Sequence, residues 1–287
     1  MTSRRTFIKQ SAVLFAALSA DPSMMLAKKK KIGLQLYTMR AALSTDPKGT
    51  IEKIAATGYT DVETFGYTGG KYFGYDPAAF SNLLKANNLV TTSGHYGLNN
   101  YLYQNAPDDE VKRLIDAIKV VGQQYLTIPS VPRTAKSADD YKPVAQRMNK
   151  AAALCKDAGI MLAYHNHDFE FIQLPGGKGY DVLLTYTDPS LVKFELDLYW
   201  AVKGGQDPIA IFKQHPGRFP LWHVKDMDKT VNTKNTEVGL GSIDFKKIFK
   251  NAKLSGMKHF YVEMDTFQID PFESIAKSYQ YIDKRIL

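Results

Sequence analysis

HVKD (His223 to Asp226) closes a short apolar run that begins at Phe219. Other β-rich runs also finish in His, Asp or Glu: LAYHNHDFEF (Leu162 to Phe171), ELDLYW (Glu195 to Trp200) and YVEMD (Tyr261 to Asp265). Each run is separated from the next by enough residues for one helix. Parallel barrel strands all end at one rim. Strands that finish in metal-ligand residues therefore predict a (β/α)8 barrel with a metal at its C-terminal face.

The same alternation of strand and helix extends over the rest of the chain. Strands are expected at residues 31–40, 61–67, 90–97, 125–131, 160–171, 192–200, 219–228 and 259–265. Helices are expected at residues 50–60, from about Pro77, and at 108–122, 137–159 with a break near Pro143, 180–186, 207–217, 243–256 and 270–286. This repetition favours a closed α/β barrel, and a doubly wound sheet is the structural alternative.

Length and charge narrow the class of protein. A chain of 287 residues with 44% hydrophobic residues is long enough for a single barrel domain. Of the net charge of +8, residues 1–27 contribute +2 and Lys28 to Lys31 a further +4, which leaves +2 for the remainder. Because the basic excess lies mostly at the N-terminus, we expect no nucleic-acid partner.

The N-terminus has the pattern of an export signal. SRRTFIK (Ser3 to Lys9) precedes the apolar SAVLFAALSA (Ser11 to Ala20), which is too short to span a bilayer as a helix. The adjacent arginines resemble a twin-arginine signal, which a translocase recognises as an address. We expect residues 1–27 to direct export to the periplasm or another exported location, and residues 28–287 to form the barrel. No ideal cleavage motif is present, so a retained membrane tether is the alternative to cleavage.

The strand ends carry the residue types of a metal site. Side chains two residues apart share a face of a strand, which places His165 and His167 together. Asp197, His223 and Glu263 end the apolar parts of the next three runs. A set of imidazole and carboxylate ligands suits a divalent transition ion (Mn, Zn, Co or Fe) better than Ca or Mg. One such residue alone would more often be a hydrogen-bonded structural group, but four on consecutive strands indicate a metal.

These motifs resemble the sugar phosphate isomerase/epimerase superfamily, the xylose isomerase-like TIM barrels that include ketose 3-epimerases, inosose dehydratase and endonuclease IV. The resemblance rests on IGLQLYTMR, HNHDFEF, LDLYW, HVKD followed by VGLGSIDF, and VEMD. It implies a small-molecule carbohydrate substrate, a divalent metal cofactor, and an isomerase, epimerase or lyase reaction. It does not specify the substrate, and it leaves homo-oligomerisation open.

By this resemblance the metal ligands fall on His165, Asp197, His223 and Glu263. Ketose epimerases carry a glutamate where this chain has His165, and Glu170 is the alternative ligand from the same run. Only Glu263 remains of the glutamate pair that those epimerases are thought to use on the two faces of the substrate. We therefore expect proton removal on one face and loss of a leaving group through an enediolate. Inosose dehydratase and exported relatives that act on 3-keto-glycosides are the analogy.

Further polar and aromatic residues are assigned to the mouth of the barrel. The catalytic base is expected to be Glu263, His167 or His95. Lys225 is expected to hold a sugar hydroxyl or a developing oxyanion, or else to form a surface salt bridge. Residues near strand ends that are candidates for substrate binding are Gln35, Tyr37, Glu63 and Trp200.

The sequence thus predicts a metal-dependent carbohydrate enzyme. Because phosphorylated sugars are mainly cytoplasmic, an exported member is expected to act on a non-phosphorylated keto-sugar or 3-keto-glycoside. Two alternatives are a non-catalytic sugar-binding barrel and an endonuclease IV-like nuclease. The nuclease would need more metal ligands at the rim than the sequence provides. It would also need a strongly basic face, which the sequence lacks.

Overall fold

A computed structural model describes residues 31–104, 106–231 and 234–287. The expected export segment, residues 1–27, lies outside the described residues. Among the residues that the structure describes, no helix is long and apolar enough to cross a membrane.

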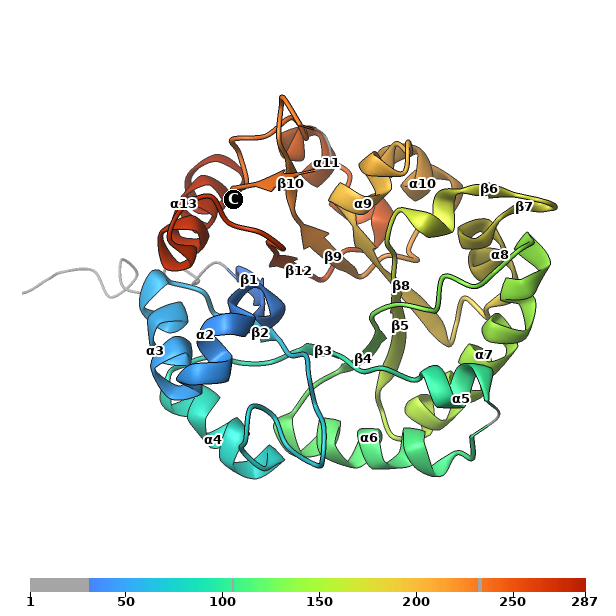
Figure 1. Cartoon of the computed structure of the whole chain (residues 1–287), viewed down its shortest axis with the longest axis horizontal. Coiled ribbons are helices and arrows are strands. Elements are labelled where there is room, and N and C mark those ends of the chain that lie inside the picture. The colour runs from blue at the N-terminus through green and yellow to red at the C-terminus, as the bar shows by residue number, and fades with distance from the viewer. Residues whose placement is uncertain (1–30, 105, 232–233) are drawn as a thin grey trace, which may run out of the picture. The chain divides into compact units, whose positions relative to one another are not determined.

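Eight parallel strands form a nearly closed barrel (Figure 1). They are β1 (Gly33–Gln35), β2 (Asp61–Glu63), β3 (Ser93–His95), β4 (Tyr125–Ile128), β5 (Met161–His165), β8 (Val192–Asp197), β9 (Leu221–Val224) and β12 (His259–Val262). Their order is β2-β1-β12-β9-β8-β5-β4-β3. Parallel bridges from Asp61 to Val90 and from Thr64 to Gly94 connect the β2 and β3 ends of this order. The predicted barrel is therefore confirmed, and the doubly wound sheet is excluded.

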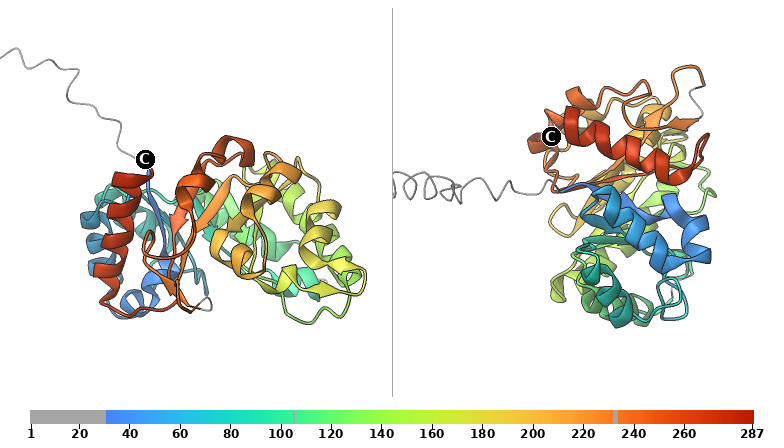
Figure 2. Two further views of the ribbon diagram at one scale, coloured as in Figure 1. Left: turned by 90° about the horizontal axis from the view of Figure 1, so that it is seen from above. Right: turned by 90° about the vertical axis from the view of Figure 1, so that its left-hand side faces the viewer.

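Helices surround the strands, as Figures 1 and 2 show from three directions. They are α2 (Arg40–Thr45), α3 (Pro47–Thr57), α4 (Pro77–Ala86), α5 (Asn99–Tyr103), α6 (Asp109–Val121), α7 (Tyr141–Asp157), α8 (Gly179–Tyr186), α9 (Leu198–Lys203), α10 (Pro208–Gln214), α11 (Phe245–Phe249), α12 (Ala252–Ser255) and α13 (Pro271–Arg285). Two small antiparallel pairs lie outside the barrel sheet: β6 (Gln173–Leu174) with β7 (Gly177–Lys178), and β10 (Asp226–Met227) with β11 (Asn235–Thr236).

Four of the helices begin with the dipeptide Asp-Pro. At the start of α3, α4, α10 and α13 the aspartate side chain accepts a backbone N–H of the first turn, and the proline follows at once. Aspartate satisfies an otherwise unpaired N–H, and proline has the φ angle that the first helical residue needs. These short motifs set where half of the major barrel helices start.

Several expected strands are shorter than predicted. The strand expected at 31–40 ends at Gln35, whose side chain accepts the N–H of Tyr37 at 3.0 Å and starts a short 3-10 turn. The strand expected at 192–200 ends at Asp197, whose side chain accepts the N–H of Trp200 at 2.9 Å and caps α9. The helix expected at 137–159 divides near Pro143 as predicted: a 3-10 turn ends at Asp140, α7 begins at Tyr141, and Pro143 lies in the first turn of α7.

Alternation along the strands separates the barrel interior from the helix layer. In β9, Trp222 faces outward and its ring stacks on Phe212 of α10 at 5.1 Å. Leu221 faces inward and packs with Ala163 and Tyr261. The next interior positions, two residues further along these strands, belong to the candidate site.

Candidate metal centre

The candidate site forms one layer of side chains above the apolar residues that fill the barrel interior. Ala163 and Leu221 fill the interior, and His165 and His223 follow two residues later on β5 and β9. Glu263 directly follows β12, two residues after Tyr261. These positions share the interior face because side chains repeat every second residue. The strand register therefore brings the ends of different runs to one level.

The four predicted ligands converge. Each contributes one donor atom to a group whose members lie within 4.8 Å of one another: His165, Asp197, His223 and Glu263. His223 Nδ1 lies 3.0 Å from Glu263 Oε2 and 3.8 Å from Asp197 Oδ2, and His165 Nε2 lies 3.5 Å from Asp197 Oδ2. Donors around a tetrahedral ion with bonds of about 2.0–2.1 Å are roughly 3.3 Å apart. The separations therefore match a coordination shell.

Hydrogen bonds orient His165 toward the shared space. Its Nδ1–H donates to the carbonyl oxygen of Pro129 at 3.0 Å, since a carbonyl can only accept. Nε2 is therefore left with its lone pair, and this buried atom has no hydrogen-bond partner; neither has Asp197 Oδ2. An imidazole held through its other nitrogen is the usual arrangement of a metal ligand. These buried donor atoms, which have no hydrogen-bond partner, fit a divalent ion.

His223 is oriented in the same way, by a carboxylate. Its Nε2 lies 2.6 Å from Glu63 Oε2, which leaves Nδ1 for the cluster. Burial would lower the pKa of His223, but Glu195, Glu263 and Glu63 outweigh burial and raise it well above the ordinary value. Excess negative charge therefore surrounds this ring. A divalent cation would compensate that charge and take the place of the proton on Nδ1.

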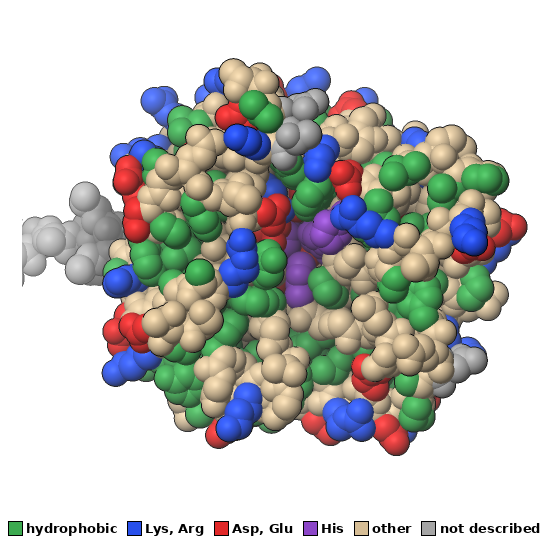
Figure 3. Space-filling model, in the orientation of Figure 1, with side chains coloured by type: hydrophobic (Ala, Val, Ile, Leu, Met, Phe, Trp, Pro, Cys, Tyr) green, Lys and Arg blue, Asp and Glu red, His purple; other side chains and the backbone are tan. Residues whose placement is uncertain are grey.

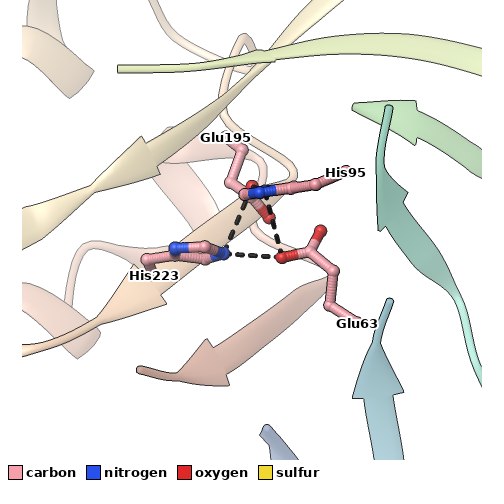
Figure 4. Close-up of side chains that lie close together, drawn as sticks. All are labelled: Glu63, His95, Glu195 and His223. Carbon is pink, nitrogen blue, oxygen red and sulfur yellow. Dashed lines mark hydrogen bonds and ion pairs between the residues drawn. The ribbon is translucent and has the colours of Figure 1, made fainter. Parts of the chain in front are cut away.

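A second group of donors shares His223 with the first, and Figure 4 shows its members. It contains Glu63, His95, Glu195 and His223. Glu195 Oε2 is 2.7 Å from His95 Nε2, and Glu63 Oε2 is 2.6 Å from His223 Nε2. These are hydrogen-bond lengths and are too short for two ligands of one ion. The second group is therefore a hydrogen-bonded network that orients His223, the residue it shares with the first group.

Glu195 was missed by the sequence analysis. It lies two residues before Asp197 on β8 and therefore shares the interior face. Burial, and then the neighbouring Glu63, raise its pKa well above the usual range. The period of two along ELDLYW was the signal that would have found it.

Gln35 and Glu63 do not reach the substrate pocket predicted for them. Both side chains are completely buried, and Gln35 donates through Nε2 to Glu63 Oε2 at 2.6 Å. That oxygen in turn lies against His223. Their positions make them orienting residues for His223, because they lie on the interior face below the rim.

Lys225 is enclosed by carboxylates. Its Nζ lies 2.8 Å from Glu263 Oε2, 2.9 Å from Asp265 Oδ2 and 3.4 Å from Asp197 Oδ2. Burial would lower the pKa of Lys225, but these anions raise it well above its ordinary value. With 1% of the side chain exposed, the surface salt bridge considered from the sequence is excluded.

Asp226, the last residue of HVKD, has a structural role. Its carboxylate accepts the backbone N–H groups of Gly239, Gly241 and Ile243 at 2.9–3.1 Å. A Cβ on Gly241 would lie 2.2 Å from Asp226 Oδ1, so glycine is required for this close approach. The Asp226 side chain of HVKD therefore holds the backbone of the VGLGSIDF loop in place.

Glu170 does not join either group of donors. It is completely buried and accepts hydrogen bonds from the Tyr164 hydroxyl and from the backbone N–H of His167. Burial raises its pKa to about 7. The position of Glu170 gives no support to the alternative ligand, and His165 is the residue from this run that faces the cluster.

A cavity of about 420 Å³, which we call the metal-site pocket, opens above the cluster. Predicted site residues that line it are Tyr37, His95, His165, His167, Trp200, Lys225 and Glu263. In the space-filling view, histidine side chains lie at the bottom of a hollow near the centre of the face, with acidic side chains beside them (Figure 3). His167 Nδ1 is buried and has no hydrogen-bond partner. Burial, and then His165, lower the pKa of His167 to about 3, so the ring is neutral near pH 7.

The model of the family described as Xylose isomerase-like TIM barrel matches residues 51–285. The chain belongs to this family. A crystal structure of a sugar phosphate isomerase/epimerase from Parabacteroides distasonis superimposes with a TM-score of 0.81 at 31% identity, and the match covers 91% of this chain and 96% of that one.

Curated relatives match over a shorter stretch. Inosose dehydratase from Clostridium beijerinckii is 30% identical over 166 residues, which is 51% of this chain and 55% of that protein. The chain thus spans about half the length of the curated relatives it matches. A structure of the IolI protein with a bound zinc atom has a TM-score of 0.67 at 15% identity and covers 88% of this chain and 97% of that one. It shows likeness of fold alone.

Proposed function

We propose that this chain is a metal-dependent carbohydrate enzyme that removes a proton beside a carbonyl group of a non-phosphorylated keto-sugar or 3-keto-glycoside. As a lyase it would expel a leaving group, and as an isomerase or epimerase it would return the proton. The observation that carries the proposal is the meeting of His165, Asp197, His223 and Glu263 at the floor of an aromatic-walled pocket. We further propose that twin-arginine export places this activity outside the cytoplasm.

A divalent ion held by these four residues would act as a Lewis acid and make the C–H bond next to a carbonyl more acidic. We propose that His167 accepts that proton. It lines the pocket, and its Nδ1 is unpaired. By contrast, His95 is hydrogen-bonded to Glu195, and Glu263 Oε2 contacts both His223 and Lys225.

The elimination balances without an oxidant or reductant. In a 3-keto-glycoside the C2–H bond and the C1–O bond break, a C1=C2 double bond forms, and the aglycone leaves as an alcohol. His167 receives the proton from C2, and the leaving oxygen takes up a proton from His167 or from water. The presence of a single base of this kind supports a lyase over a symmetrical epimerase.

The charge of the metal-site pocket supports a non-phosphorylated substrate. Among the described residues that line it, Lys225 is the one Lys or Arg, and its ammonium group already contacts three carboxylates. A phosphate needs cations with donors to spare. A neutral sugar ring needs aromatic faces and hydroxyl partners, and Trp200, Tyr37 and Asp265 provide both.

The decisive experiment incubates the metal-loaded protein with 3-keto-glycosides and free ketoses in D2O. Release of the aglycone with an unsaturated sugar supports the lyase. Deuterium next to the carbonyl without cleavage supports the isomerase or epimerase. If neither occurs although metal and sugar both bind, the protein is a sugar-binding barrel and the enzyme proposal is wrong.

The role of His167 is tested by His167→Gln, with His215→Gln as the matched control away from the pocket. We expect kcat to fall by about 10²–10⁴-fold in the first variant, because a general base contributes that much. Metal content measured by mass spectrometry should stay at one ion per chain in both. Equal kcat for the two variants would remove His167 from the mechanism.

A further inference from the structure

A second cavity of about 420 Å³ lies next to the metal-site pocket. We call it the side pocket; it is lined by Arg40, Ser44, Phe65, Gly66, Thr68, Lys71, Phe73 and Gly74. Phe65 and Gly66 line both cavities. Each cavity is within the range of about 300–1,000 Å³ that small-molecule sites occupy. The two cavities are therefore adjoining compartments, separated by one aromatic ring and one residue without a side chain.

The two compartments differ in their charged groups. The metal-site pocket carries the carboxylates of Glu263 and Asp265 together with the ammonium group of Lys225. The lining of the side pocket contains Arg40 and Lys71 and no acidic residue. Arg40 donates to the carbonyl oxygens of Tyr37 and Asp265, which uses two of its five N–H groups. Neither cation forms an ion pair with a carboxylate in the part of the chain that the structure describes.

The walls of the side pocket are aromatic and held in place. Phe73 packs edge-to-face on Phe65 at 5.3 Å and contacts Phe80 at 5.7 Å. Its φ is +49°, a left-handed conformation that is rare for an aromatic residue and costs free energy. The backbone hydrogen bonds between Tyr72 and Tyr75, at 2.8 and 2.9 Å, hold this turn. The strained turn keeps a phenylalanine ring beside the side pocket.

We infer that the side pocket binds the aglycone of the substrate, and that this aglycone is an aromatic ring bearing an anionic group such as a carboxylate. The inference rests on the proposed function, which places the reacting sugar ring over the metal cluster. Rings on Phe65 and Phe73 would hold the aromatic part, and Arg40 and Lys71 the anion. The two cations of the side pocket would thus place the anionic end of the aglycone away from the metal-site pocket, where Lys225 already contacts carboxylates.

The test compares three 3-keto-glucosides on the metal-loaded full chain: methyl, phenyl and 4-carboxyphenyl. Dissociation constants are measured by calorimetry with the corresponding unoxidised glucosides, and turnover is measured with the keto forms. We expect the 4-carboxyphenyl glucoside to bind about ten-fold or more tighter than the methyl glucoside. Equal binding of all three glucosides would overturn the inference.

Two variants locate the effect in the side pocket. Gly66 has φ +70° and open space around its Cβ position, and asparagine tolerates that conformation, so Gly66→Asn would project a side chain between the compartments. The preference for aryl over methyl glucoside should fall about ten-fold. Gly69→Asn is the matched control, since Gly69 has φ +58°, equally open space, and lines neither cavity.

Lys71→Gln should lower the preference for 4-carboxyphenyl over phenyl about three-fold, as expected for one exposed ion pair. Lys119→Gln on the outer helix α6 makes the same charge change elsewhere.

Equal effects of each variant and its control would also overturn the inference. If aryl preference follows the variants but no glycoside is turned over, the side pocket stands and the proposed function fails. If glycosides are turned over without any preference for the aryl forms, the proposed function stands and the side-pocket inference fails.

Discussion

The two donor groups around His223 contain the same kinds of residue, yet they differ in the spacing of their donor atoms. In the group of His165, Asp197, His223 and Glu263, donor atoms are 3.0–3.8 Å apart, and the closest pair, His223 Nδ1 and Glu263 Oε2, is hydrogen-bonded at 3.0 Å. In the group with Glu63, His95 and Glu195, the closest pairs are 2.6 and 2.7 Å apart and already hydrogen-bonded. Residue type alone therefore does not define a metal site. The spacing of the donor atoms distinguishes the ligands from their support.

The largest expected effect separates Asp197 from Glu195, two residues on the same face of β8. Asp197→Asn should weaken metal binding by more than about 100-fold, beyond the loss typical of a supporting residue. The amide oxygen keeps the cap on Trp200 N–H, so the barrel should remain folded. Glu195→Gln is the matched variant and should retain metal within about ten-fold. The measurement is metal affinity by competition with a chelator. Equal losses in both variants would contradict the distinction between the two groups.

An intermediate effect concerns Glu170, a buried carboxyl outside both groups. Its pKa is raised from the usual 4.5 to about 7, so between these values the folded protein keeps a proton that the unfolded chain has lost. The contribution of Glu170 to the free energy of unfolding is fully present below pH 4.5. It is lost as the pH rises from 4.5 through 7, by up to about 3 kcal/mol in total. Glu170→Gln should lack this fall. Urea unfolding at pH 5 and pH 8 tests it, and parallel pH dependence in the two proteins would refute it.

A smaller effect is expected for Glu63→Gln. Because Glu63 Oε2 accepts the Nε2–H of His223, the variant should lose about 10–100-fold in metal affinity, the usual cost of altering an orienting partner. If Glu63 instead contacted substrate, as its place at a strand end suggests, metal affinity would be unchanged and KM would rise. Chelator competition and steady-state kinetics on one preparation separate these outcomes.

Much of the fold follows from short patterns in the chain. Asp-Pro pairs begin four helices, and Gly58 and Gly122 end α3 and α6 in left-handed conformations. Strand lengths were overestimated where a polar side chain turned back on the backbone, as Gln35 and Asp197 do. The periodicity of the sequence predicts the face of a strand on which a residue lies. It does not predict where a side chain will accept a backbone N–H and so end the strand.

The sequence by itself determined that His165, Asp197, His223 and Glu263 lie at strand ends, because strand ends and two-residue alternation can be recognised from local patterns of residues. The tertiary structure decided that Glu195 joins Glu63 and His95 as support, that Lys225 is enclosed by carboxylates, and that Arg40 meets the loop of Phe73 at a second cavity. These arrangements depend on distances between strands far apart in the chain. Barrel closure and register set such distances to within an ångström, and no local pattern of residues encodes them.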